Sequence, residues 1–206
     1  MSAESPVPPE VVAAEGVAPE GAPPEGAPIP PEVPEPDGKD WSFVVERPCA
    51  ECGFDPDSVE QWHLADLYRE GGERFAAAVE REDAEERPAP QVWSVIEYGR
   101  HVADVLEVMR ERLELILAEG GTGTAEFESW DGDAAALEEE YWRANGHATA
   151  LLLRERAEAA AEAWSGVVGC QWDWAGVRDD GTGFTPWTLG LYLAHELVHH
   201  LHDVNG

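Results

Sequence analysis

The chain has 206 residues, of which 43% are hydrophobic, and its 43 acidic side chains against 13 lysines and arginines give a formal charge of −30. This size predicts one domain, or one domain with an appendage, and so negative a chain repels phosphate backbones and anionic lipids, which excludes nucleic acid and membrane surfaces as expected partners. Neither a signal-peptide pattern nor an apolar run long enough to cross a bilayer is present, so we expect a cytoplasmic protein.

Residues 1–40 form the first distinct segment. They hold eleven of the sixteen prolines, repeat PEGAP at 19–23 and 24–28, and contain nine acidic residues but no aromatic one. Such a segment buries too little apolar surface to offset the entropy lost on ordering. We therefore predict a disordered acidic tail over 1–40 and a folded domain over 41–206, and a solvating role for the tail is favoured over a partner-binding arm.

Two of the three cysteines follow, as Cys49-x-x-Cys52. An odd number of cysteines does not indicate a disulfide framework and suits a reducing compartment. The pair could belong to a zinc knuckle or a redox centre, but no second such pair exists, and Cys170 would bring the thiolates only to three. The sequence favours a structural turn that docks the N-terminal segment on the domain.

Four helices are predicted from the apolar periodicity. The first covers about 57–80, and the second begins after a capping-box pattern, Ser94 with Glu97, and ends at Gly120. The third covers about 131–164, with Gly146 as a possible interruption, and the fourth covers about 186–203, after Thr185. Without sustained strand alternation, the pattern predicts an all-α fold, a four-helix bundle.

The fourth helix carries the most informative motif, HELVHHLHDV at 195–204. At 100° per residue, His195, His199 and His202 share one helix face, and imidazoles four residues apart can grip one cation. His101, at the edge of the apolar stripe of the second helix, is the best third ligand, although a hydrogen-bonded core histidine is the alternative. The sequence thus predicts a divalent metal on His101, His195 and His199.

Other readings of this motif stay open. His195 to His199 also matches the zinc-peptidase pattern H-E-x-x-H, with Glu196 as general base. Only seven residues follow His199, too few for the usual downstream ligand, so a hydrolase of this type, with a ligand from upstream, is a remote alternative. His200 is expected to solvate the C-terminal end of the helix. His202 is a candidate ligand, or a residue that contacts the ligands without binding the metal itself.

Five segments in order carry a family resemblance. They are CAECGFD at 49–55, VWSVIEYGRHVADV at 92–105, WDGD at 130–133, GVRDDGTGFT at 176–185 and LAHELVHHLHDV at 193–204. The chain resembles the DinB superfamily, and more narrowly an actinobacterial branch similar to mycothiol-dependent maleylpyruvate isomerase. The resemblance implies a four-helix bundle, a metal triad matching His101, His195 and His199, and a frequent homodimer. Because some members have Glu first in the late pair, a Glu196/His200 register is the alternative; it is disfavoured because His195 shares a face with Leu191 and Val198.

A three-imidazole site leaves a coordination position open, as in catalytic metal sites. We expect a divalent cation, zinc first with nickel or iron as alternatives, that activates a low-molecular-weight thiol such as mycothiol for attack on a small electrophile. Glu196 and His202 are expected close to the metal, and Arg178 and Trp187 at the pocket. The opposing hypothesis is a non-enzymatic metal-binding or stress-response module.

Overall fold

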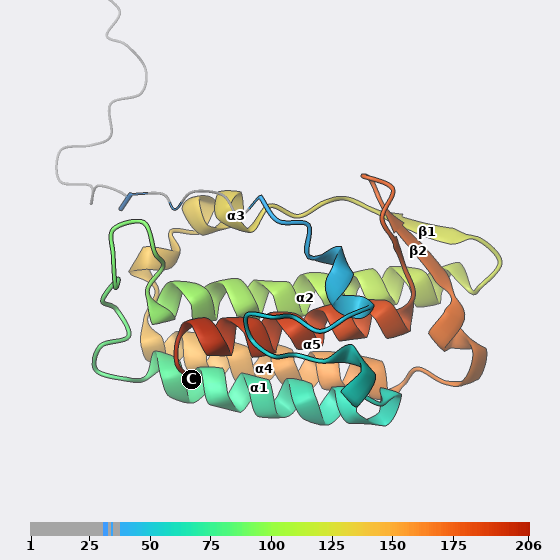
Figure 1. The fold of residues 1–206 in the computed structure, drawn as a ribbon, viewed down its shortest axis with the longest axis horizontal. Coiled ribbons are helices and arrows are strands. Elements are labelled where there is room, and N and C mark those ends of the chain that lie inside the picture. The colour runs from blue at the N-terminus through green and yellow to red at the C-terminus, as the bar shows by residue number, and fades with distance from the viewer. Residues whose placement is uncertain (1–30, 33, 35–37) are drawn as a thin grey trace, which may run out of the picture.

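The computed structural model describes residues 31–32, 34 and 38–206. Four long helices run alongside one another (Figure 1): α1 (Leu64–Val79), α2 (Val95–Glu119), α4 (Gly146–Ser165) and α5 (Pro186–Asp203). The predicted four-helix bundle is confirmed. Most of the tail that we predicted to be disordered lies outside the described residues.

The helices α2 and α5 begin where local capping predicts. The Ser94 hydroxyl accepts a hydrogen bond from the Glu97 amide and the Glu97 side chain accepts one from the Ser94 amide, which closes the capping box, and Gly120 ends α2 in the left-handed conformation with φ 73°. Thr185 caps α5 by accepting from the amide of Thr188, and Pro186 occupies the first turn. These signals are local, so the sequence alone locates both helices.

The other two predicted helices are interrupted. The region 57–63 contains the 3₁₀ turns η2 (Pro56–Ser58) and η3 (Gln61–His63), separated by extended backbone, so α1 starts only at Leu64. The predicted helix over 131–164 is divided into α3 (Gly132–Glu138), the turn η4 (Tyr141–Arg143) and α4. Glu140 adopts φ 50°, which ends the helical path, and Asn145 then caps α4.

A small sheet at one end of the bundle was not predicted (Figure 1). Its strands are β1 (Thr124–Phe127), β2 (Ala175–Arg178) and β3 (Gly183–Phe184). β1 pairs in parallel with β2, Thr124 opposite Ala175, and β2 pairs antiparallel with β3. Strands of four, four and two residues are too short to show the period-two alternation by which strands are recognised.

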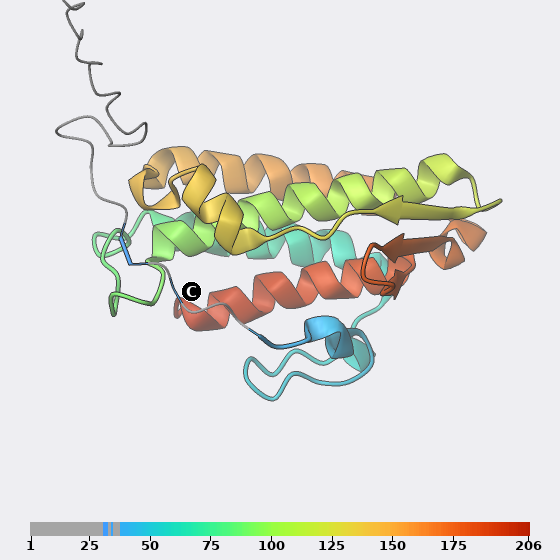
Figure 2. The same cartoon turned by 90° about the horizontal axis from the view of Figure 1, so that it is seen from above.

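The helix α5 is held in the bundle by buried polar contacts. The Tyr68 hydroxyl donates to the Gly190 carbonyl at 2.9 Å, and the Trp164 indole donates to the Pro186 carbonyl at 3.0 Å. A Cβ at residue 190 would lie 2.6 Å from the Trp164 indole nitrogen, so only glycine allows this approach. The N-terminal segment, which includes η1 (Trp41–Val45), lies over the outer side of α5 (Figure 2).

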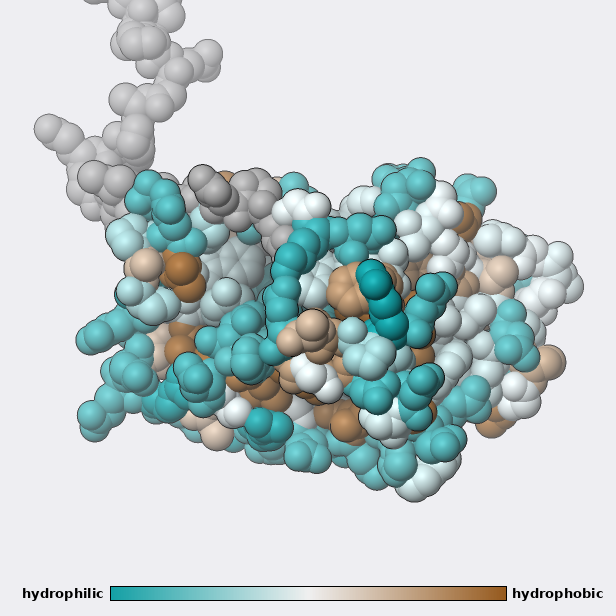
Figure 3. Space-filling view, in the orientation of Figure 1, coloured by the Kyte–Doolittle hydropathy of each residue, from teal (hydrophilic) through white to brown (hydrophobic). Residues whose placement is uncertain are grey.

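The surface in Figure 3 alternates hydrophilic side chains with small apolar patches. Among the described residues, no helix is long and apolar enough to cross a membrane.

Candidate metal centre

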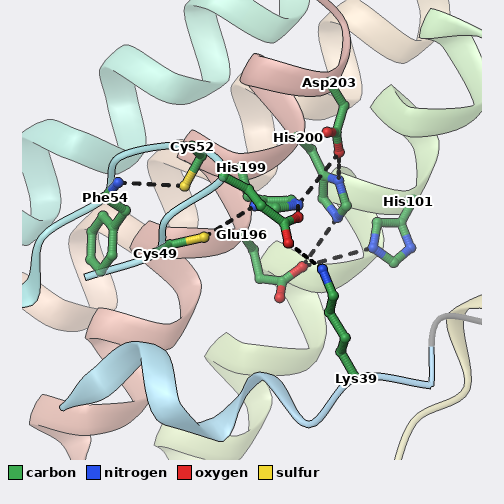
Figure 4. A network of polar contacts seen from close by, with 10 residues as sticks. Lys39, Cys49, Cys52, Phe54, His101, Glu196, His199, His200 and Asp203 are labelled. Atoms are coloured by element: carbon green, nitrogen blue, oxygen red, sulfur yellow. Dashed lines mark hydrogen bonds and ion pairs between the residues drawn. The ribbon is translucent and has the colours of Figure 1, made fainter. Parts of the chain in front are cut away.

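Two flanks of α5 carry two separate groups of metal-ligating side chains. Successive residues of a helix are rotated by about 100°, so residues 195 and 199 share one flank and residues 196 and 200 share the next. The flank with Glu196 and His200 faces α2, which contributes His101. The flank with His195 and His199 faces the N-terminal segment, which contributes Cys49 and Cys52 (Figure 4).

We call His101, Glu196 and His200 the α2 group. Their ligand atoms all lie within 4.8 Å of one another. Glu196 Oε2 lies 3.3 Å from His200 Nε2 and 3.9 Å from His101 Nε2, so the carboxylate stands between the two imidazoles. The three side chains are 13%, 13% and 17% exposed, so the group is mostly but not fully buried.

Charge in the α2 group is balanced by its own members and by Asp203. Burial acts to lower the pKa of His200, but its contacts with Asp203, 2.9 Å away, and with Glu196 raise it to about 9. Burial acts to raise the pKa of Glu196, yet the imidazoles of His101 and His200 hold it well below its usual range. Burial lowers the pKa of His101. The group therefore combines a carboxylate with a neutral imidazole that is ready to ligate.

Aromatic rings and a glycine surround His101. Trp93 and Trp130 lie with their ring centroids 5.2 and 5.4 Å from that of His101. Gly132, at the start of α3, leaves room for the imidazole, because a Cβ there would lie 2.8 Å from His101 Cε1. Both Trp130 and Gly132 belong to the WDGD segment, so this segment forms one wall around His101.

We call Cys49, Cys52, His195 and His199 the cysteine group. Their four ligand atoms also lie within 4.8 Å of one another, and Cys49 Sγ lies 3.8 Å from His199 Nδ1. Cys49 is 2% exposed, His195 1% and His199 9%. Cys52 is half-buried.

The cysteines are held by a tight turn. The Cys49 amide donates to the Phe54 carbonyl at 2.9 Å, and the Gly53 amide donates to the Cys49 carbonyl at 2.9 Å. Gly53 has φ 77°, a conformation that favours glycine. The Phe54 amide donates to Cys52 Sγ at 3.5 Å, whereas burial raises the pKa of the Cys52 thiol to about 11. Both cysteines are free thiols.

The predicted triad is thus divided between the two groups. His195 and His199 lie together as expected, but His101 lies with Glu196 and His200, the register that the sequence disfavoured. The reason is that both flanks of α5 are covered, one by α2 and the other by the N-terminal segment, and helical periodicity cannot tell which cover each flank has. His202 is exposed and belongs to neither group of the described residues.

The remaining predicted pocket residues lie farther along α5 and in the sheet. The Trp187 ring packs against Trp172 at 6.4 Å, near the start of α5. Arg178 in β2 pairs with Asp180 at 2.6 Å and lies over the ring of Phe184. The ligand role of Cys49 and Cys52 was not favoured by the sequence, although Cys-x-x-Cys together with His-x-x-x-His is itself a four-ligand signal.

Two arginines act electrostatically on Tyr192, one turn before Glu196 on the same flank of α5. Burial raises the pKa of the Tyr192 hydroxyl, the charge of Glu196 raises it further, and the charges of Arg178 and Arg112 act against both. Arg112 is 6% exposed and donates to the Glu128 carbonyl at 2.8 Å. These two guanidinium groups therefore lie within electrostatic reach of the same tyrosine as Glu196, with Asp179 and Asp180 beside them.

Comparison with known proteins is consistent with this architecture. The model of the DinB superfamily matches residues 68–204, which include most of α1 and all of α2, α4 and α5. The chain belongs to the DinB superfamily. Among solved structures it is similar to YfiT from Bacillus subtilis, described as a probable metal-dependent hydrolase with an unusual four-helix bundle topology, with 18% identity and a TM-score of 0.60 over 72% of this chain and 89% of that one. No curated protein matches this DinB-superfamily chain.

Proposed function

We propose that this DinB-superfamily protein is a metal-dependent enzyme that uses a low-molecular-weight thiol of the mycothiol type. It either transfers the thiol to a small anionic electrophile or uses the thiol to isomerise that electrophile. The observation that carries the proposal is the α2 group, in which ligand atoms of His101, Glu196 and His200 lie within 4.8 Å of one another and stay partly exposed. Three protein ligands leave a fourth coordination position for water or substrate, which is the arrangement of a catalytic zinc site.

The residues of the α2 group fit a divalent cation. His101 Nε2 lies 3.9 Å from Glu196 Oε2, beyond hydrogen-bonding distance, so the nitrogen and the carboxylate face each other across a gap that a cation can fill. Two imidazoles and a carboxylate suit zinc first, and nickel or iron as alternatives. A bound cation would supply an electrophilic centre that favours the ionised form of a thiol. His101, Glu196 and His200 would hold it.

The chain's own residues also indicate the charge of the second substrate. With a formal charge of −30, the protein repels anions in general. Arg112 and Arg178 are two cations within electrostatic reach of Tyr192, one turn from Glu196, although Asp180 pairs with Arg178. Guanidinium groups bind carboxylates with paired hydrogen bonds, so we place the carboxylate of the electrophile at these arginines. Their role is to orient the substrate toward the α2 group.

Hydrolysis is the second candidate function. A set of two histidines and one glutamate occurs in zinc hydrolases, and the similar YfiT is described as a probable metal-dependent hydrolase. The H-E-x-x-H peptidase arrangement is not favoured, because it requires His195 and His199 on the same cation that Glu196 serves as base, whereas both histidines face the cysteine group. A non-enzymatic metal-binding module is the third candidate.

Turnover assays separate these candidates. Zinc-loaded protein is mixed with mycothiol and a chromogenic electrophile bearing a carboxylate, and separately with a chromogenic ester alone. The proposal predicts thiol-dependent turnover that is lost in His101→Ala and His200→Ala and kept in His202→Ala, the matched control on the same helix. Ester hydrolysis without thiol dependence supports the hydrolase instead, and equal rates in all four proteins contradict any enzymatic role of the α2 group.

A further inference from the structure

The cysteine group has the composition and geometry of a closed zinc site. Zinc–sulfur bonds of about 2.3 Å and zinc–nitrogen bonds of about 2.0 Å place the ligand atoms of a tetrahedron roughly 3.3 to 3.8 Å apart. Cys49 Sγ and His199 Nδ1 already lie 3.8 Å apart, and all four ligand atoms lie within 4.8 Å of one another. We propose that Cys49, Cys52, His195 and His199 bind a structural zinc ion, separate from the catalytic site at the α2 group.

The polar atoms of His195 support this site independently. Both Nδ1 and Nε2 of its imidazole are buried and lack any hydrogen-bond partner in the part of the chain that the structure describes. A buried ring of which neither nitrogen is satisfied is rare in folded proteins. Its ring is packed against Trp41 at 5.3 Å and Phe54 at 5.7 Å between centroids. A cation bound to one of the two nitrogens of His195 gives that nitrogen the partner that the surrounding residues do not provide.

The turn around the cysteines is preorganised for metal. In Cys49-x-x-Cys52-Gly53, the left-handed glycine and the backbone hydrogen bonds between Cys49 and Phe54 bring both sulfur atoms to the same side. The Phe54 amide donates to Cys52 Sγ, a contact that stabilises a thiolate. Cys170 is exposed and stands apart from the group, so exactly the two cysteines of this turn are available.

Four protein ligands complete the tetrahedral coordination of zinc and leave no position for a substrate, so this ion has a structural role: it holds two segments of the chain together. Cys49 and Cys52 belong to the N-terminal segment, and His195 and His199 belong to α5, nearly 150 residues later. The ion therefore closes a long loop and holds the N-terminal segment on α5 (Figures 2 and 4). Because α5 also supplies Glu196 and His200, the same ion fixes the helix that carries two of the three side chains of the α2 group.

Cobalt(II), added alone to metal-free protein, distinguishes the two sites. In the Cys170→Ser variant the only thiols are Cys49 and Cys52. We expect a near-ultraviolet sulfur-to-cobalt absorption band that is kept in His101→Ala, where it saturates with one cobalt per chain, and that is lost when Cys52→Ser is added. Cobalt binding without a sulfur band, or a band unchanged by Cys52→Ser, overturns the proposal. If the zinc-loaded protein shows no turnover but the sulfur-to-cobalt band is present, the proposed function is contradicted and the zinc site at the cysteine group is supported.

A second test uses limited proteolysis of the wild-type protein, so its result does not depend on whether a variant folds. Glu51 lies within the turn and is exposed, so glutamyl endopeptidase can cleave after it when the turn is released. Zinc-loaded protein is expected to resist this cleavage, and addition of a chelator is expected to expose it. Equal cleavage rates with and without chelator overturn the structural role. A disulfide between Cys49 and Cys52 in protein purified under reducing conditions overturns the site itself.

Discussion

Gly132 lies so close to His101 that a Cβ atom on residue 132 would stand 2.8 Å from Cε1 and 2.9 Å from Nδ1 of the imidazole. Such a contact is shorter than van der Waals packing allows, so Gly132→Ala is expected to turn His101 away from Glu196. Displacing a ligand from its orientation lowers metal affinity by roughly 10- to 100-fold. Zinc titration against a competing chelator measures this change.

Gly183→Ala is the control for that substitution, because a Cβ at residue 183 meets nothing within 4 Å. It is expected to leave zinc affinity unchanged. Unaltered affinity in Gly132→Ala would show that His101 is not a ligand in the folded protein.

Arg178 is expected to select the charge of the substrate. Replacing it with glutamine removes one of the two cations near Tyr192, so KM for an electrophile with a carboxylate should rise about tenfold while kcat changes little. KM for a neutral electrophile of the same shape should not change. Arg143→Gln, an exposed arginine that pairs with Glu140, is the control. An equal rise in KM for both electrophiles would refute the orienting role.

The pair of Arg87 and Glu97 stabilises the start of α2. The Glu97 side chain is 2% exposed and accepts hydrogen bonds from the amide and hydroxyl of Ser94, both at 2.8 Å. Arg87→Ala leaves this carboxylate buried without its cation, so the free energy of unfolding should fall by about 3 kcal/mol. Arg154→Ala, which removes the exposed pair with Glu73, should have little effect in the same urea titration. Similar losses in both variants would contradict this assignment.

The helices could be predicted because their signals are local. The capping box at Ser94 and the Thr185-Pro186 start fix α2 and α5 without reference to the rest of the chain. The break before α4 depends on the left-handed backbone of Glu140 and on the close approach of Gly146 to Val79, which no periodicity records. The short strands depend on pairing between residues about fifty positions apart.

The site shows the same limit. The 195–200 motif pointed to α5, and His101 was selected as its partner on the second helix, but the grouping of these side chains required knowledge of what covers each flank. Apolar neighbours such as Leu191 indicated that His195 points inward. They could not indicate that the cover on that flank is the turn with Cys49 and Cys52. Tertiary packing therefore decides which histidines lie close enough together to share a cation.

Anomalous X-ray scattering at the zinc edge, from crystals of the zinc-loaded protein, tests the central claim most directly. The claim is that α5 serves two separate metal sites on adjacent flanks. We predict two peaks per chain, one among His101, Glu196 and His200 and the other among Cys49, Cys52, His195 and His199. A single peak shared by His101, His195 and His199 would contradict it.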